Sequence, residues 1–196
     1  MSKLFIFLFL LIMPVKSYAE TTLRMANWLP PTHPWVIDIM IPWIENVKLA
    51  TQGRVKIELL NAPIGPPPAH FNFAVKGIAD ITYGVHNYTA GRFSSTQITE
   101  LPFLSNSSEV LSVAWQRIYE RELFHLDEHK GTHLLGIFTH GPGHLWFNKQ
   151  YESLQNINGL KVRIGGGIAQ SSAKALGLVP LQAPVTKAYE LLSGGV

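Results

Sequence analysis

The residue with the clearest chemical setting is Arg163, which lies near the end of a short apolar run and just before three glycines, Gly165 to Gly167. The residues that follow, 168–176, predict a helix. Open α/β sheets bind their ligands beyond the carboxyl ends of the strands. A guanidinium there can hold a carboxylate by two parallel hydrogen bonds, and the N–H groups of a glycine turn and a helix start favour an anion. The alternative is that Arg163 pairs with a structural carboxylate and the glycines only form a turn.

Two histidines and several aromatic residues suit the same kind of site. His86 and His144 lie in loops beside predicted strand ends, where either side chain can donate a hydrogen bond to a bound acid. Simple exposure to solvent is the alternative for both. The aromatic residues that could wall an apolar pocket, with core packing as the alternative, are Trp28, Tyr83, Tyr88 and Trp146.

The segment from His125 to His129 matches the pattern H-x-x-E-H. Two histidines four residues apart on a helix could hold zinc while Glu128 acts as a base, as in a hydrolase. A third ligand would have to come from elsewhere, and a solvated helix end with histidines favoured by the helix dipole is the simpler interpretation. The sequence has no G-x-S-x-G elbow, P-loop or cysteine nucleophile, so we predict neither catalysis nor a cofactor.

The pattern along the chain predicts the elements that position these residues. An amphipathic helix is expected around residues 36–47, kinked at Pro42 and ended by Gly53. With a second helix up to Lys76, the opening order is β-α-β-α-β, typical of a parallel, doubly wound sheet. The strands predicted in this half are 22–27, 55–59 and 78–84.

The second half predicts a long helix followed by further α/β elements. Asn106 and Glu109 have capping-box spacing at the start of a helix that runs toward Gly131. Residues 100–103 are expected to form a short buried connector. The later strands predicted are 134–138, 145–148, 160–164 and 179–182, and the later helices are 168–176 and 186–193.

The first 19 residues predict a secretory signal peptide, with a cationic start, an apolar run over Leu4–Val15 and a small-x-small site at residues 17–19. The run is too short for a membrane span, which needs about 20 residues, although an uncleaved anchor is the alternative. Without Lys3 and Lys16 the chain has 14 basic and 13 acidic residues and no basic cluster, so we predict no nucleic-acid partner. There is no cysteine, so an ordinary core must hold the fold.

Several stretches, in this order, resemble the DctP-type periplasmic solute-binding proteins of tripartite ATP-independent (TRAP) transporters. The resemblance covers essentially the whole chain after the signal peptide. The stretches are LRMANWLPP at 23–31, GIADI at 77–81, YTAGRF at 88–93, ELPF at 100–103, NGLKVR at 158–163, ALG at 175–177 and YELL at 189–192.

The resemblance implies an α/β, two-lobed periplasmic binding protein fold with doubly wound sheets that closes on a carboxylate and passes it to integral membrane TRAP transporter subunits. Arg163 stands at the family's Gly-Leu-Lys-x-Arg arginine, which pairs with the ligand carboxylate. Some relatives carry a second arginine in the region where this chain has His144, so the resemblance does not predict a two-arginine clamp here. His144 is expected to take part of that arginine's role. The predicted ligand-binding residues are Arg163, Asn27, Trp28, Tyr83, His86, His144 and Gly165.

We therefore expect a signal peptide at 1–19, a first α/β lobe at 20–140 and the start of a second lobe at 141–196. The second lobe is expected to be incomplete, because the chain stops at Gly194-Gly195-Val196 without a closing element. The expected function is a non-enzymatic periplasmic receptor for a small organic acid. The alternatives are a secreted zinc hydrolase using His125, Glu128 and His129, and a nonfunctional truncated fragment.

Overall fold

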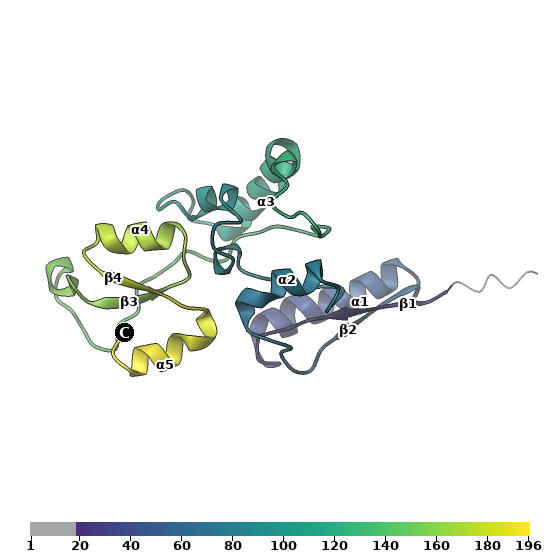
Figure 1. Cartoon of the computed structure of the whole chain (residues 1–196), viewed down its shortest axis with the longest axis horizontal. Helices are drawn as coiled ribbons and strands as arrows, with labels where there is room; N and C mark the ends of the chain where they lie inside the picture. Colours follow the sequence, from purple (N-terminus) through teal and green to yellow (C-terminus); the bar gives the residue numbers. More distant parts are fainter. Residues whose placement is uncertain (1–18) are drawn as a thin grey trace, which may run out of the picture.

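The computed structural model describes residues 19–196, which form two α/β lobes with a helical segment lying above them (Figure 1). Residues 1–18, and with them nearly all of the predicted signal peptide, lie outside the described part. Within residues 19–196, every helix is too short or insufficiently apolar to cross a membrane.

The first lobe is built on two parallel strands, β1 (Thr21–Met25) and β2 (Val55–Leu59). Successive residues of β2 are alternately exposed and partly buried, as in a strand with one packed face. Ile81 adds a third parallel position by forming a single bridge with Met25. The strand predicted at 78–84 is therefore wrong in extent, since this one bridge is its whole contribution to the ladder.

The crossover between β1 and β2 is a helical segment that changes type near Pro42. A π-helical turn, Trp35–Met40, runs directly into α1 (Ile41–Ala50), and Pro42 lies in the first turn of α1. Proline has no N–H to donate to the preceding turn, so an irregular turn ahead of it costs no further hydrogen bond. The structure thus shows a change of helix type just before Pro42, and the predicted kink stays a prediction. Gly53, with a φ of 77°, ends the segment.

The crossover helix between β1 and β2 packs its apolar side against the sheet.

A second, shorter helix, α2 (His70–Val75), follows a 3-10 turn at Pro67–Ala69, and its first residue, His70, is completely buried. Burial of apolar area is the main favourable term that holds such a layer in place. The buried core of the lobe consists of Met25, Trp28, Leu29, Val36 and Met40.

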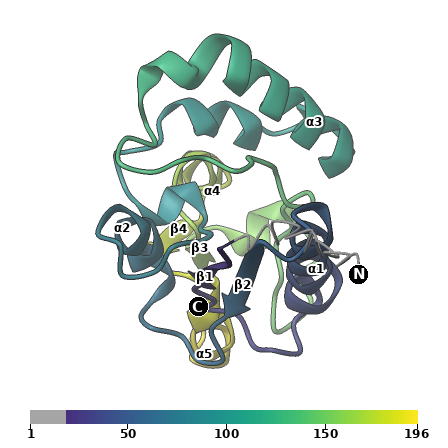
Figure 2. The ribbon, with the colours of Figure 1, turned by 90° about the vertical axis from the view of Figure 1, so that its right-hand side faces the viewer.

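The segment above the two lobes is α3 (Ser108–Ile118), continued by a π-helical turn, Tyr119–Leu123, and a 3-10 turn, Phe124–Leu126 (Figure 2). The helix is capped by Ser107, whose Oγ accepts the Val110 N–H at 3.2 Å. The predicted cap, Asn106, is wrong by one residue, because the side chain that reaches the first free N–H groups belongs to Ser107.

The second lobe repeats the parallel β-α-β arrangement on a smaller scale. Strands β3 (Lys161–Ile164) and β4 (Val179–Gln182) are parallel, with Arg163 opposite Leu181. Helix α4 (Ile168–Ala175) connects them, and α5 (Ala188–Ser193) follows. The buried core consists of Ile157, Ile164, Ala173 and Leu178. The predicted fold class, α/β with two lobes, is confirmed.

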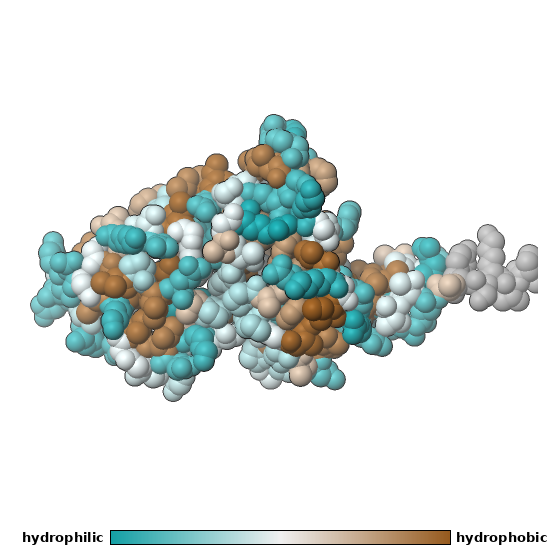
Figure 3. All heavy atoms as spheres, viewed as in Figure 1, coloured by the Kyte–Doolittle hydropathy of each residue, from teal (hydrophilic) through white to brown (hydrophobic). Residues whose placement is uncertain are grey.

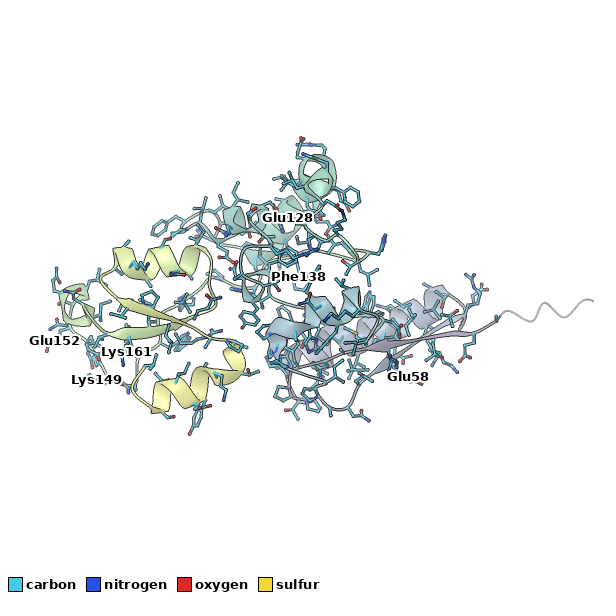
Figure 4. All side chains as sticks on the ribbon, in the orientation of Figure 1. Glu58, Glu128, Phe138, Lys149, Glu152 and Lys161 are labelled. Carbon is cyan, nitrogen blue, oxygen red and sulfur yellow. The ribbon has the colours of Figure 1, made fainter. Side chains whose placement is uncertain are left out.

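Three other predicted features are wrong. Residues 134–138 and 145–148 form no strand, since they meet no partner ladder within residues 19–196. Phe103, expected in a buried connector, is fully exposed and has a left-handed φ of 66°. Exposed apolar side chains appear on both lobes in Figure 3, and Phe138, beside α3 in Figure 4, is also among them.

Candidate ligand-binding site

Arg163 is the third residue of β3, and its side chain is half-buried at the boundary between the lobes. Its Nε donates to the carbonyl of Ala183 at 2.7 Å, and its Nη2 donates to the hydroxyl of Tyr88 at 3.1 Å. A guanidinium has five N–H donors, so these two bonds leave others for a ligand. Among the described residues no carboxylate forms an ion pair with Arg163, so the structural ion pair considered as the alternative is absent.

The first lobe contributes an aromatic wall at the carboxyl end of β1. The rings of Trp28 and Tyr83 are stacked with centroids 5.0 Å apart, and the indole N–H donates to the Tyr83 carbonyl at 3.2 Å. The Tyr83 hydroxyl donates to Oδ1 of buried Asn27 at 2.8 Å. Burial raises the pKa of the Tyr83 phenol, so it stays a neutral donor.

Asn27 acts within the first lobe rather than toward the cleft. Besides the Tyr83 hydroxyl, its Oδ1 accepts the Leu29 N–H at 2.9 Å, and its Nδ2 donates to the Leu29 carbonyl at 2.9 Å. Both amide atoms are thus used inside the lobe. In this structure Asn27 positions the aromatic wall, and its predicted contact with a ligand stays a prediction.

Tyr88 joins this wall to the arginine; the sequence suggested it as a wall residue but did not place it among the predicted ligand-binding residues. Its ring lies 6.4 Å from the Trp28 ring, between centroids. Its hydroxyl accepts bonds from Arg163 and, at 2.8 Å, from the Val185 N–H. Gly165 lies against the same ring, because a methyl group added there would be 3.7 Å from Tyr88 Cε1. The structure thus brings Trp28, Tyr83, Tyr88, Arg163 and Gly165 together, although they come from both lobes.

The start of α4, which the sequence suggested for a ligand anion, faces a side chain of the protein. The Glu100 carboxylate lies against Gly167, where an added Cβ would be 2.7 Å from Glu100 Oε2, and it accepts a hydrogen bond from the Asn87 amide. Burial raises the pKa of Glu100, and the Asn87 amide and the Ile168 N–H partly offset that rise. The anion-favouring position of α4 is therefore occupied by Glu100 here.

A polar hollow of about 260 Å³ adjoins this point. It lies where the segment 86–97 of the first lobe meets α4 and the end of β4. Its polar lining is neutral and includes Asn87, Gln170 and Gln182. The Gln182 amide also crosses between the lobes, donating to the Asn87 carbonyl at 3.2 Å. Polar contacts therefore join the two lobes here as well as at Tyr88.

Residues 25–196 match the DctP family, bacterial extracellular solute-binding protein family 7. The chain belongs to this family. A curated relative, the outer membrane transporter protein TsaT of Comamonas testosteroni, is 28% identical over 184 residues, which are 93% of this chain and 54% of TsaT.

Solved structures of TRAP solute-binding proteins resemble most of the chain. A TRAP periplasmic solute-binding protein of Bordetella bronchiseptica with bound (R)- and (S)-mandelate is 41% identical and superimposes with a TM-score of 0.85, covering 89% of this chain and 56% of that one. A TRAP solute-binding protein of Rhodoferax ferrireducens with benzoate is 29% identical, with a TM-score of 0.81 over 89% of this chain and 55% of that one. This DctP-family chain therefore spans little more than half the length of the relatives it matches.

His86 lines the hollow, and its ring contacts other side chains of the first lobe. Its Nε2 lies 3.1 Å from Nε2 of His129, whose Nδ1 is 2.6 Å from the Tyr119 hydroxyl, and its ring is stacked on Phe93 at 4.2 Å. Burial, together with nearby His129, lowers the pKa of His86 to about 4, against a weaker opposing effect of Glu128. In this DctP-family chain His86 is a neutral anchor of the loop that carries Tyr88.

His144 is not brought to the arginine. Its side chain is exposed, and its recorded neighbour is the Trp146 ring at 6.4 Å. Its predicted role as a partial substitute for a second arginine finds no contact in this structure, because the loop that carries it lies on the surface.

The Glu128 and His129 side chains of the H-x-x-E-H segment bond to other protein groups. Glu128, labelled beside α3 in Figure 4, accepts hydrogen bonds from Ser95 Oγ at 2.5 Å, Ser95 N–H at 2.9 Å and Ser94 Oγ at 3.0 Å. Burial opposes ionisation of Glu128, but these bonds outweigh it and lower its pKa. In residues 19–196 no three histidine, aspartate or glutamate side chains are grouped as metal ligands. The zinc hydrolase alternative is therefore not favoured.

Proposed function

We propose that this chain is a receptor that captures a small organic acid at the boundary of its two lobes. The observation that carries the proposal is Arg163, a half-buried guanidinium that has spare donors and no carboxylate partner in the described chain. A partly desolvated cation gains most from a ligand that brings a negative charge and two acceptor oxygens. A monocarboxylate supplies both.

We further propose that the body of the acid is aromatic. The side of the site that faces Arg163 consists of Trp28, Tyr83 and Tyr88, whose rings offer apolar faces at fixed angles. Aromatic pairs prefer stacked or edge-to-face contacts, which a flat ring can add to. The similar proteins of B. bronchiseptica and R. ferrireducens hold mandelate and benzoate, which is consistent with this choice.

Capture of the acid would favour the closed arrangement of the lobes. Tyr88 and Asn87 of the first lobe already bond to Arg163, Val185 and Gln182 of the second. A ligand that contacts both sides binds the closed state more tightly than the open one, so it shifts the population toward closure. The acid would leave unchanged, since the chain acts as a receptor and not as an enzyme.

We also propose that the receptor works in the periplasm and hands the acid to the integral membrane subunits of a TRAP transporter. The family's extracellular character and the secretory pattern of residues 1–19 support this location. We propose residues 20–140 as the first lobe of this receptor and residues 141–196 as the start of its second lobe.

The direct test is ligand binding by the chain from Glu20 onward, measured by thermal shift and calorimetry. Benzoate, mandelate and 3-hydroxybenzoate are expected to raise the melting temperature, because they bind the native state. Benzamide, which has the ring without the charge, and succinate, which has two charges and no ring, are expected to bind more weakly.

The variant Arg163→Ala is expected to lose about 2–5 kcal/mol of benzoate affinity, as when one partner of a buried charge pair is removed. Arg117→Ala is the matched control, since Arg117 is an exposed arginine on α3. Equal affinities of Arg163→Ala and the unchanged chain would contradict the proposal. So would a clean melt that none of the acids shifts.

A further inference from the structure

The Tyr88 hydroxyl occupies an unusual place, because it belongs to one lobe and is bonded to the other. Tyr88 ends the 3-10 turn His86–Tyr88, next to the first-lobe wall. Its two recorded partners, Arg163 Nη2 and the Val185 N–H, lie 75 and 97 residues further along the chain. The hydroxyl therefore stands between the aromatic wall and the cation.

Both partners can only donate a hydrogen bond, so the hydroxyl oxygen must be the acceptor in both contacts. A phenol that accepts through its oxygen still carries its own proton. Among the hydrogen bonds of residues 19–196, none is donated by this hydroxyl. The O–H of Tyr88 is thus a donor in need of a partner, 3.1 Å from the guanidinium expected to hold the ligand.

We infer that Tyr88 determines specificity by donating this proton to the carboxylate that Arg163 holds. The inference rests on the proposed function. The two accepted bonds withdraw electron density from the oxygen, which strengthens its O–H as a donor. They also fix the direction of the ring, so a carboxylate meets a donor that is already oriented. An amide or ester of the same body lacks the negative oxygens that would make this bond charge-assisted.

The position of the hydroxyl gives this bond a second effect. The contacts with Arg163 and Val185 exist only while the lobes are together, so the donor is oriented in the closed arrangement. A carboxylate that receives this proton binds the closed state preferentially. Tyr88 would therefore couple recognition of the acid to closure through its own bonds to the second lobe, whereas the hydrogen bonds of Trp28 and Tyr83 stay within the first lobe.

The test begins with Tyr88→Phe, which keeps the ring and removes the hydroxyl. We expect benzoate to bind about tenfold or more weakly, as for the loss of one charge-assisted hydrogen bond. Benzamide binding is expected to change less. Tyr189→Phe is the matched control, since Tyr189 is 85% exposed on α5.

A second arm distinguishes donation from a purely structural role. Replacement of Tyr88 by 3-fluorotyrosine makes the phenol a better donor and a poorer acceptor, while at neutral pH it stays mainly protonated. If the proton goes to the ligand, benzoate binds more tightly than to the unchanged chain. If the oxygen serves only as an acceptor for Arg163, benzoate binds more weakly. The same replacement at Tyr189 shows the effect of fluorine alone.

The outcomes separate this inference from the proposed function. If the unchanged chain binds no acid, the proposed function fails and the inference fails with it. If the unchanged chain binds benzoate and Tyr88→Phe binds it equally well, or 3-fluorotyrosine weakens binding, the inference alone is overturned. Should Tyr88→Phe fail to fold, as judged by circular dichroism, the fluorinated protein still decides between donor and acceptor.

Discussion

The two sides of the site differ in how completely their polar groups are satisfied. On the first-lobe side, Asn27 and Tyr83 bond to each other and to backbone groups of their own lobe, and Trp28 bonds to the Tyr83 carbonyl. On the second-lobe side, Arg163 keeps donors without partners in the described chain. The polar groups of Asn27, Trp28 and Tyr83 are thus paired on folding, whereas Arg163 would gain its remaining partners only from the proposed ligand.

Because of this difference, covering the two sides costs different amounts of free energy. A wall whose polar groups are already paired loses little when a ligand covers it, so it can fix the shape of the pocket. An arginine with open donors is costly to bury without an anion. Substitutions in the wall should therefore affect folding and binding together, whereas substitutions of Arg163 should affect mainly binding.

The largest effect on stability is expected for Trp28→Ala. Trp28 is buried and packs in the core of the first lobe, so the change should lower the free energy of unfolding by about 3–5 kcal/mol. Urea denaturation measures this directly. Trp146→Ala, at a tryptophan that is 80% exposed, is the control and should change stability little. Equal losses of unfolding free energy in the two variants would contradict the assignment of Trp28 to the packed core of the first lobe.

A smaller effect is expected for Asn27→Ala. The change leaves the Tyr83 hydroxyl and the Leu29 N–H without an acceptor in a buried place, which should cost about 1–3 kcal/mol of unfolding free energy. Asn106→Ala, at an exposed asparagine, is the matched control. Benzoate affinity should fall along with stability. If affinity falls while stability is unchanged, Asn27 contacts the ligand directly, and the first-lobe side, like Arg163, has a polar group that serves the ligand.

The smallest effect is expected from mild acidification. The folded-state pKa of His86 is about 4, below the ordinary value of 6.5, so the unfolded chain binds the proton more readily. Stability from this group is complete above pH 6.5 and declines as pH falls toward 4. Between pH 7.5 and 6 we expect a loss of about 1 kcal/mol from His86. Chemical denaturation at several pH values measures it.

The variant His86→Gln tests the origin of that loss. It removes one titrating group, so the dependence of unfolding free energy on pH should become shallower. His125→Gln, at an exposed histidine, is the matched control. An unaltered dependence in His86→Gln would assign the acid sensitivity to other groups whose pKa burial also lowers, such as His70 and His129.

The local elements of the fold could be predicted well from sequence. Strands β2 and β4 have the bounds expected from their patterns, and β1, β3 and α4 differ by one or two residues. Besides the cap of α3 and the exposed Phe103, the errors concern strands that need a partner. Residues 134–138 have a strand-like composition but no ladder beside them, and strand preference depends on such neighbours more than on the residues themselves.

The site divides in the same way. Arg163 could be found because its position at a strand end, before glycines and a helix, is a local pattern. The role of Tyr88 could not, since its hydroxyl partners lie 75 and 97 residues away. The occupation of the α4 start by Glu100 depends equally on a distant segment and escaped prediction for the same reason.

The separation of wall and arginine on different lobes has an evolutionary consequence. The aromatic residues that would shape the pocket belong to the first lobe, and the cation that would recognise the acid group belongs to β3 of the second. Mutations that reshape the wall can therefore change the preferred body of the acid without disturbing the residue that recognises its charge. If the proposed function holds, a lineage of such receptors could diversify the acids that it binds by altering one lobe, while the other lobe preserves recognition of the carboxylate.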